Sequence, residues 1–273
     1  MKTDLIYGVE DRPPFKDALF AALQHLLAIF VAIITPPLII ASALKLDVEK
    51  TSFLVSMSLF ASGVSTFIQC RRIGPIGAKL LCIQGTSFSF IGPIIATGLV
   101  GGLPLIFGSC IAAAPIEMVV SRTFKYLRNI ITPLVSGIVV LLIGLSLIKV
   151  GIVSCGGGYG AMDDGSFGSW ENLSIAALVL LSVLFFNRCK NKYLRMSSIV
   201  FGLCLGYGLA FALGKVNMSA LNVEMLMSFN IPQPFKYGID FNISSFIAIG
   251  LVYLITAIEA TGDVTANSMI SGL

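Results

Sequence analysis

Charged residues are scarce in this sequence. Lys and Arg number 18 and Asp and Glu number 14 in 273 residues, so 12% of the chain is charged. A soluble domain has about 25%. Hydrophobic residues make up 56% of the chain. This composition excludes an ordinary soluble protein and predicts an all-α polytopic membrane protein.

Metal-binding and disulfide patterns are also lacking. Histidine occurs once, at His25, and the six cysteines are scattered without a Cys-x-x-Cys pair. We therefore predict no zinc site, no disulfide framework and no cofactor of another kind. The net charge of +4 is carried by short basic clusters between apolar runs, which argues against nucleic acid as a partner. The lipid bilayer is the partner that the composition predicts.

Apolar runs close to the roughly 20 residues that cross a bilayer recur along the chain. We expect eight spans, at 18–44, 53–69, 78–99, 103–120, 131–150, 173–186, 199–213 and from 246 onward. Thirteen Lys and Arg residues fall on the side that holds the N-terminus and five on the other. The positive-inside rule then predicts a cytoplasmic N-terminus. The Gly-rich stretch 151–172 becomes extracytoplasmic, and we expect a flexible loop there.

The last span carries two carboxylates, Glu259 and Asp263. A charged side chain at the centre of a spanning helix costs roughly 2.5–3.5 kcal/mol on insertion scales. Residues four apart share one helix face, and Thr256 and Asn267 fall on the same face. Glu259 could be a helix-end residue that reaches the interface. Because the polar face continues beyond it, the pattern favours an ion or substrate site inside the membrane.

The third span contains a second polar run, at 84–89. Its Gly, Thr, Ser and alternating Phe residues disfavour a helix and favour a short extended segment. Non-helical backbone at this depth is tolerated only where it lines a cavity or is buried in protein. Its N–H and C=O groups could bind a planar ligand on which Phe88 stacks, although lipid or core packing also explains the Phe residues. His25, beside Gln24 in the first span, is either a packed or a functional residue.

Three classes of membrane protein could explain this pattern: a hydrolase, a channel and a secondary transporter. Hydrolysis by paired carboxylates needs two opposed groups sharing a water, which Glu259 and Asp263 on one helix do not supply. Serine hydrolysis needs a Ser, His and acid motif that the sequence does not contain. A channel needs polar rings through several spans. Broken helices with a carboxylate near the midplane favour a secondary transporter, and therefore no enzyme.

Four stretches resemble the nucleobase–ascorbate transporter family, and within it bacterial xanthine permeases. They are QHLLAIF (24–30), ITPLVSGIVVLLIGLSLIKVGI (131–152), PFKYG (234–238) and IEATGDVTANSMIS (258–271). The resemblance runs from Asp4 to the end of the chain. It implies proton-coupled uptake of a purine nucleobase across the bacterial inner membrane. Xanthine is the first expectation for the substrate, with urate or another nucleobase as alternatives.

The fold implied by the resemblance has fourteen spans in two inverted repeats of seven. Spans 1–4 and 8–11 form a substrate-binding core, and spans 5–7 and 12–14 form a gate through which the protein forms a homodimer. The chain would hold the first repeat and span 8, so a transport-incompetent fragment that acts only by oligomerisation is an alternative. The implied parts are a cytoplasmic segment 1–17, core spans 18–128, gate spans 129–215, an extracytoplasmic connection 216–245 and core span 8 at 246–273.

The resemblance also implies roles for five residues. Glu259 hydrogen-bonds the base, while the main chain of Ser87 and the ring of Phe88 contact it. Asp263 and His25 are associated with proton coupling and affinity. In the family the second repeat supplies a partner strand for the extended segment. Without that strand we expect the backbone groups of the segment to be unpaired.

Overall fold

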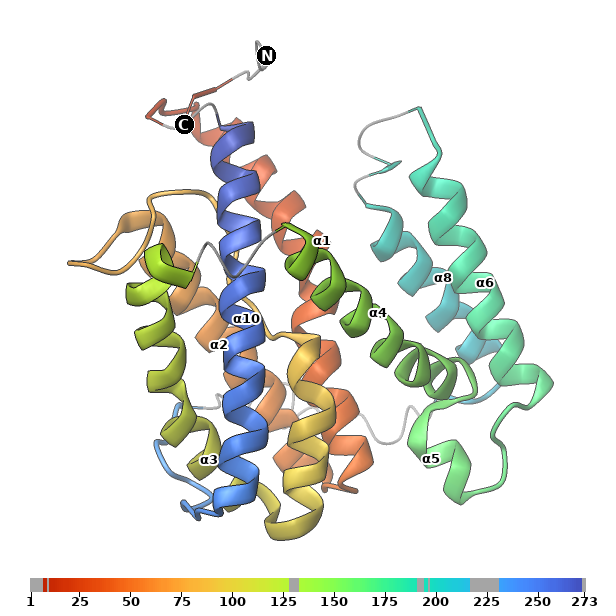
Figure 1. The fold of residues 1–273 in the computed structure, drawn as a ribbon. Helices are drawn as coiled ribbons and strands as arrows, with labels where there is room; N and C mark the ends of the chain where they lie inside the picture. Colours follow the sequence, from red (N-terminus) through yellow and green to blue (C-terminus); the bar gives the residue numbers. More distant parts are fainter. Residues whose placement is uncertain are drawn as a thin grey trace. The chain divides into compact units, whose positions relative to one another are not determined.

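The computed structural model describes residues 7–8, 10–127, 133–190, 194–195, 197–216 and 231–271. Within these ranges the protein is helical and contains no β-strand (Figure 1). The predicted all-helical class is confirmed. The long helices are α1 (Phe15–Ala43), α2 (Val48–Arg71), α3 (Ile91–Leu127), α4 (Pro133–Cys155), α6 (Trp170–Asn187), α8 (Ser198–Ala212) and α10 (Ile243–Ile270). The short ones are η1 (Phe88–Phe90) and α5 (Gly158–Asp163).

The described helices have the length and surface of membrane spans. Four stretches are long and apolar enough to cross a bilayer: Val48–Arg71, Phe88–Thr123, Trp170–Asn187 and Ile243–Thr265. α8 and the second half of α1 are apolar but shorter. Large hydrophobic side chains point outward from these helices, and none of the residues of α6 is buried. Such a surface suits a lipid environment.

α3 contains parts of two predicted spans. The helix is interrupted at Gly101 and at Gly102, whose φ of 66° and ψ of −160° lie in a region populated essentially by glycine. The paired glycines therefore allow one helix to end and the next to begin. Residues 81–87, hereafter the non-helical segment, form neither helix nor strand. The predicted non-helical part of the third span is confirmed, and the helical part begins only at Phe88.

The Gly-rich stretch 151–172 is more ordered than the flexible loop that the sequence predicts. α4 continues to Cys155, and α5 occupies part of the remainder. The Asn172 side-chain amide donates to the carbonyls of Gly156 and Ser166, both at 3.0 Å. One side chain thus holds two distant points of the loop together. Local composition does not reveal this, because the partners lie 16 and 6 residues away.

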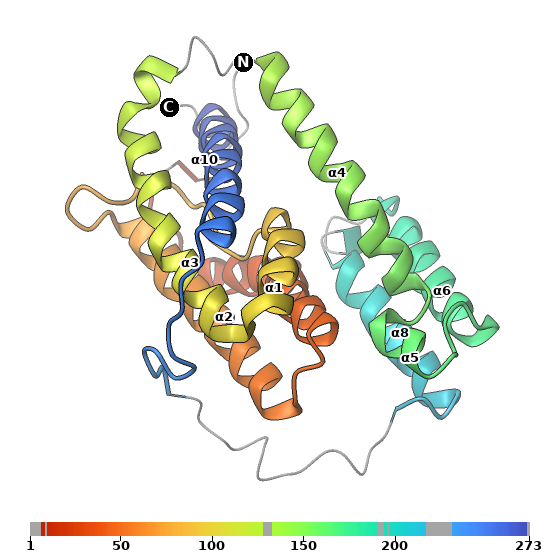
Figure 2. The ribbon, with the colours of Figure 1, turned by 60° about the horizontal axis from the view of Figure 1, so that its bottom comes forward.

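The chain divides into two compact units. The first unit comprises Met1–Arg12, Ile33–Ile148 and Pro232–Leu273, and the second comprises Pro13–Ala32 and Lys149–Ile231. In the first unit α10 packs along α3 and against η1 (Figures 1 and 2). Ile91, Ala113 and Ile249 are almost wholly buried in this packing. The first unit therefore holds both polar stretches of interest, the non-helical segment and the carboxylate-bearing α10.

In the second unit α6 packs against α8. Gly202 and Gly206 of α8 approach Val183 and Val179 of α6 so closely that an added Cβ atom would lie 2.6 Å and 2.4 Å from the valine side chains. Small residues four apart are a common means of close helix packing in membranes. The division into core and gate domains stays a prediction, and residues 217–230 of the predicted connection 216–245 lie outside the described residues.

Candidate functional site

The non-helical segment obtains hydrogen-bond partners from α2. The Gln84 backbone N–H donates to Thr66 Oγ1 at 2.9 Å, and the Ser62 hydroxyl donates to the Gln84 carbonyl. Ser62 and Thr66 are four residues apart and so share one face of the helix. The expectation that this backbone is unpaired is therefore wrong at Gln84. Two side-chain hydroxyls form the hydrogen bonds to the Gln84 backbone that a neighbouring strand would otherwise form.

Two further bonds tie the segment to α1 and α10. Thr86 Oγ1 donates to the Ile33 carbonyl at 2.9 Å. That carbonyl has no helical N–H partner, because the residue four positions later is Pro37. At the other end of the segment, the Asn267 side-chain amide donates to the Leu81 carbonyl at 2.9 Å. The segment is thus held by side chains of α2 and α10 and by a backbone carbonyl of α1.

The segment ends at Ser87, which begins the next helix. Ser87 has extended backbone angles, and its hydroxyl accepts a bond of 3.3 Å from the Ser89 N–H. The Phe90 ring packs edge-on against Tyr253 of α10, with centroids 4.9 Å apart. Tyr253 in turn donates to the Cys110 carbonyl of α3 at 3.3 Å. The ring contact places the end of η1 against α10, which brings two predicted polar stretches together.

Glu259 lies on α10 beside η1. Its side chain is half-buried, and the Ser89 hydroxyl approaches its carboxyl group. Ser89 Oγ is buried and has no hydrogen-bond partner among the described residues. A buried polar atom without a partner is uncommon and calls for an explanation. Sequence reasoning placed Ser89 in the polar run without giving it a role; its position between two Phe residues was the available signal.

Three of the five predicted site residues lie on or next to two elements that contact each other. Phe88 is the first residue of η1, Ser87 caps η1, and Glu259 lies on α10; we call the contact between η1 and α10 the η1–α10 junction. Asp263 lies one turn beyond Glu259 on α10 and is exposed. The junction combines a carboxylate, a hydroxyl without a partner among the described residues, an aromatic ring and the first N–H group of a helix.

His25 belongs to the second unit, on the first part of α1. Its ring is exposed, and Nδ1 lies 2.8 Å from the Ala21 carbonyl. Since a carbonyl only accepts, Nδ1 carries the proton in this contact. The side chain of neighbouring Gln24 lies outside the described residues. Within those residues, no group of three or more His, Cys, Asp or Glu could hold a metal ion. The role of His25 stays a prediction.

Comparison with known proteins decides between the classes that the sequence leaves open. Residues 16–273 match the permease family. The chain belongs to this family. It is 47% identical over 280 residues to the xanthine permease XanP of Escherichia coli K12, covering 98% of this chain and 60% of XanP. It is also 47% identical over 278 residues to XanQ of the same strain, covering 98% of this chain and 59% of that xanthine permease.

A more distant relative is a putative purine permease of Clostridium perfringens. It is 36% identical over 265 residues, which cover 97% of this chain and 58% of the relative. The predicted membership of the nucleobase–ascorbate transporter family is confirmed, and the chain is classed with transporters rather than enzymes. The chain spans about three fifths of the length of the curated relatives it matches.

Proposed function

We propose that the protein takes part in the uptake of a purine nucleobase, first of all xanthine, across the bacterial inner membrane. The observation that carries this proposal is the η1–α10 junction, where Glu259 lies beside a buried Ser89 hydroxyl without a partner among the described residues. The xanthine permeases named above support the choice of ligand, since they match 98% of this chain. Urate and other nucleobases remain alternative substrates.

The chemistry of an oxopurine suits the junction. Such a base presents N–H donors and carbonyl acceptors around a flat ring. The carboxylate of Glu259 is an acceptor for ring N–H groups, and the Ser89 hydroxyl is able to donate to a ring carbonyl. The Phe88 N–H, the first of η1, adds a donor at the positive end of a broken helix. Phe88 supplies an aromatic face on which the base stacks.

Proton coupling belongs to the same proposal. Asp263 is exposed on α10 one turn from Glu259, so it is able to exchange a proton while Glu259 holds the base. His25 is the second candidate for this role. The distribution of Lys and Arg supports a cytoplasmic N-terminus. The two inverted repeats and the homodimer formed through gate spans are further parts of the proposal.

A fragment that acts only by oligomerisation is not favoured. The similarity to permeases extends over 98% of the chain and includes the last helix with both carboxylates. The similarity is not confined to one part of the chain that could serve oligomerisation alone.

The test is uptake of radiolabelled xanthine by cells that lack their own xanthine uptake and express this protein. A protonophore should abolish the uptake if protons drive it. Glu259→Gln should abolish xanthine binding to the purified protein while membrane insertion stays normal. The matched control is Glu171→Gln, since Glu171 is exposed on α6 and pairs with Lys215 at 2.8 Å. Unchanged binding in Glu259→Gln would overturn the assignment.

A further inference from the structure

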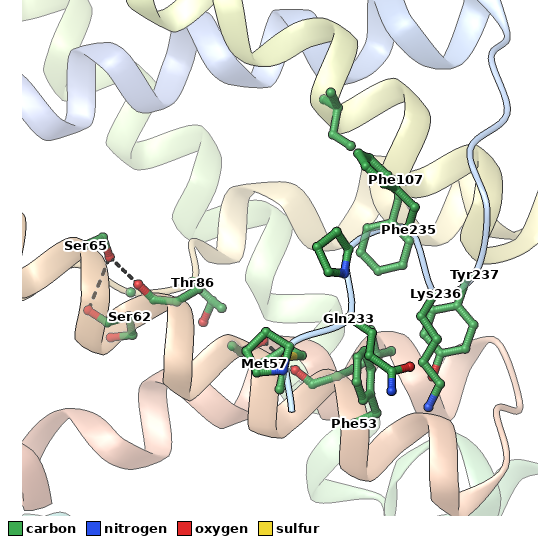
Figure 3. Close-up of a pocket in the computed structure, with 17 residues that line it drawn as sticks. Phe53, Met57, Ser62, Ser65, Thr86, Phe107, Gln233, Phe235, Lys236 and Tyr237 are labelled. Atoms are coloured by element: carbon green, nitrogen blue, oxygen red, sulfur yellow. Dashed lines mark hydrogen bonds between the residues drawn. The ribbon is translucent and has the colours of Figure 1, made fainter. Parts of the chain in front are cut away.

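A separate cavity of about 650 Å³ lies in the first unit. Its walls come from α2, the non-helical segment, α3 and residues 232–237 (Figure 3). The volume lies within the roughly 300–1,000 Å³ of small-molecule sites. None of Ser87, Phe88 and Glu259 lines this cavity, so it is distinct from the junction described above.

One end of the cavity is aromatic and cationic. The Tyr237 ring lies edge-on to Phe53 at 5.7 Å and parallel to Phe107 at 6.2 Å, measured between ring centroids. Lys236 Nζ lies 4.3 Å from the centroid of Phe53 and 3.6 Å from the exposed carboxylate of Glu49. The Tyr237 hydroxyl is buried without a hydrogen-bond partner among the described residues. Aromatic rings and a hydroxyl donor without an acceptor among the described residues therefore lie at the same end of the cavity.

The other end of the cavity is lined by hydroxyl groups. Ser62 and Ser65 of α2 lie there with Thr86, apart from the aromatic group (Figure 3). Gly85 and Thr86 belong to the non-helical segment, immediately before Ser87. A ligand at this end would therefore contact the same segment whose final residue begins the η1–α10 junction.

We propose that this cavity is a second binding site for a purine nucleobase, occupied before the base reaches the junction. The inference rests on the proposed function and adds a site to it. Tyr237 and Phe107 stack on each other and, with Phe53, add aromatic surface to the cavity wall against which a planar heterocycle can pack. The Lys236 ammonium and the Tyr237 hydroxyl supply donors for its carbonyl oxygens, and the ammonium also favours a deprotonated oxopurine. Residues 232–237 belong to the predicted extracytoplasmic connection, the side from which an imported base arrives.

Protection of an engineered cysteine tests this site directly. Gln233 lines the cavity and is exposed, so Gln233→Cys should react with a membrane-impermeant maleimide in intact cells. The parent chain, with its own six cysteines, sets the background. Xanthine should slow labelling of Gln233→Cys at least threefold. Asp164→Cys, in the loop after α5, is the matched control and should show no protection.

The Glu259→Gln background separates the two sites. If the cavity binds the base by itself, protection of Gln233→Cys persists in this background although uptake is lost. Protection that disappears with Glu259→Gln would overturn the inference, because it would report occupancy of the junction alone. Protection that is absent in both backgrounds would overturn it as well. Intact uptake in Glu259→Gln with persistent protection would instead contradict the proposed function and leave the cavity site standing.

Side chains at the aromatic end provide a second readout. Lys236→Met and Tyr237→Phe keep most of the packing of these residues and remove the donors. Each should raise the xanthine concentration needed for half-maximal protection at least threefold, and should raise KM for uptake more than it lowers the maximal rate. Protection at unchanged xanthine concentrations in both variants, with the proteins monodisperse after purification, would show that Lys236 and Tyr237 do not bind the base and would contradict the site.

Discussion

The hydroxyl of Thr86 donates a hydrogen bond to the carbonyl of Ile33, 53 residues earlier in the chain. Pro37 deprives that carbonyl of its helical partner, and the bond therefore joins a missing backbone hydrogen bond of α1 to the break in the third span. In a bilayer both groups would otherwise lack water as a partner. A single side chain thus satisfies a helix carbonyl and anchors the non-helical segment at once.

Thr86→Val tests this relationship, since it keeps the shape of the side chain and removes the donor. We expect the free energy of unfolding to fall by about 1 kcal/mol, because the Ile33 carbonyl is left without its hydroxyl partner. Thr86→Ser keeps the donor and should lose less. The measurement is reversible unfolding in mixed micelles. Equal losses in the Val and Ser variants would attribute the effect to packing.

The pairing of Gln84 with α2 predicts a larger effect. Ser62→Ala combined with Thr66→Val removes both hydroxyl partners of the Gln84 backbone, and we expect a loss of about 1–3 kcal/mol. Xanthine binding should weaken as well, because the segment leads to Ser87. Ser65→Ala is the control for stability on the same helix, since Ser65 bonds only to carbonyls of α2 itself among the described residues. An equally unstable control would contradict this interpretation.

The interruption of α3 depends on Gly102. Gly102→Ala places a side chain at φ 66° and ψ −160°, and we expect the unfolding free energy to fall by roughly 1–3 kcal/mol. Gly92→Ala is the matched control on the same helix, because an added Cβ atom there meets nothing within 4 Å. It should be neutral or stabilising by up to about 1 kcal/mol. Comparable melting temperatures for the two variants would show that a side chain at position 102 does not strain the backbone.

Asp263 should affect coupling more than binding. Asp263→Asn removes an exposed carboxylate one turn from Glu259, so gradient-driven accumulation of xanthine should fall more than xanthine exchange at equilibrium. The measurement compares the two modes in proteoliposomes. Asp164→Asn, in the loop after α5, serves as control. Equal losses in both modes would count against proton coupling through this residue.

The start of α2 predicts a pH-dependent stability. Asp47 caps this helix, and its bonds to the Lys50 side chain and backbone hold its pKa below the ordinary value of 3.8. A lowered folded pKa means that the contribution is complete above the ordinary value and is lost as pH falls through the lowered one. The melting temperature of Asp47→Ala should therefore lie below that of the parent near neutral pH. The difference should shrink below about pH 4; a constant difference would contradict the linkage.

The sequence alone determined the class of protein and the location of its main polar groups. Scarce charge and long apolar runs indicate membrane helices because hydropathy is a local property of the chain. The spacing of Glu259 and Asp263 on one helix follows in the same way from the helical repeat. The composition of residues 84–89 predicts a break in the third span, and the structure confirms one at 81–87.

Only the tertiary structure decided which groups are partners. Whether Gln84 bonds to another strand or to Ser62 and Thr66 depends on how α2 packs, and no local pattern contains that information. The same holds for Ser89 beside Glu259, 170 positions apart in the sequence. The cavity likewise forms only because residues 232–237, distant in the sequence, pack near α2 and α3. Periodicity assigns a residue to a helix face, whereas packing determines what that face contacts.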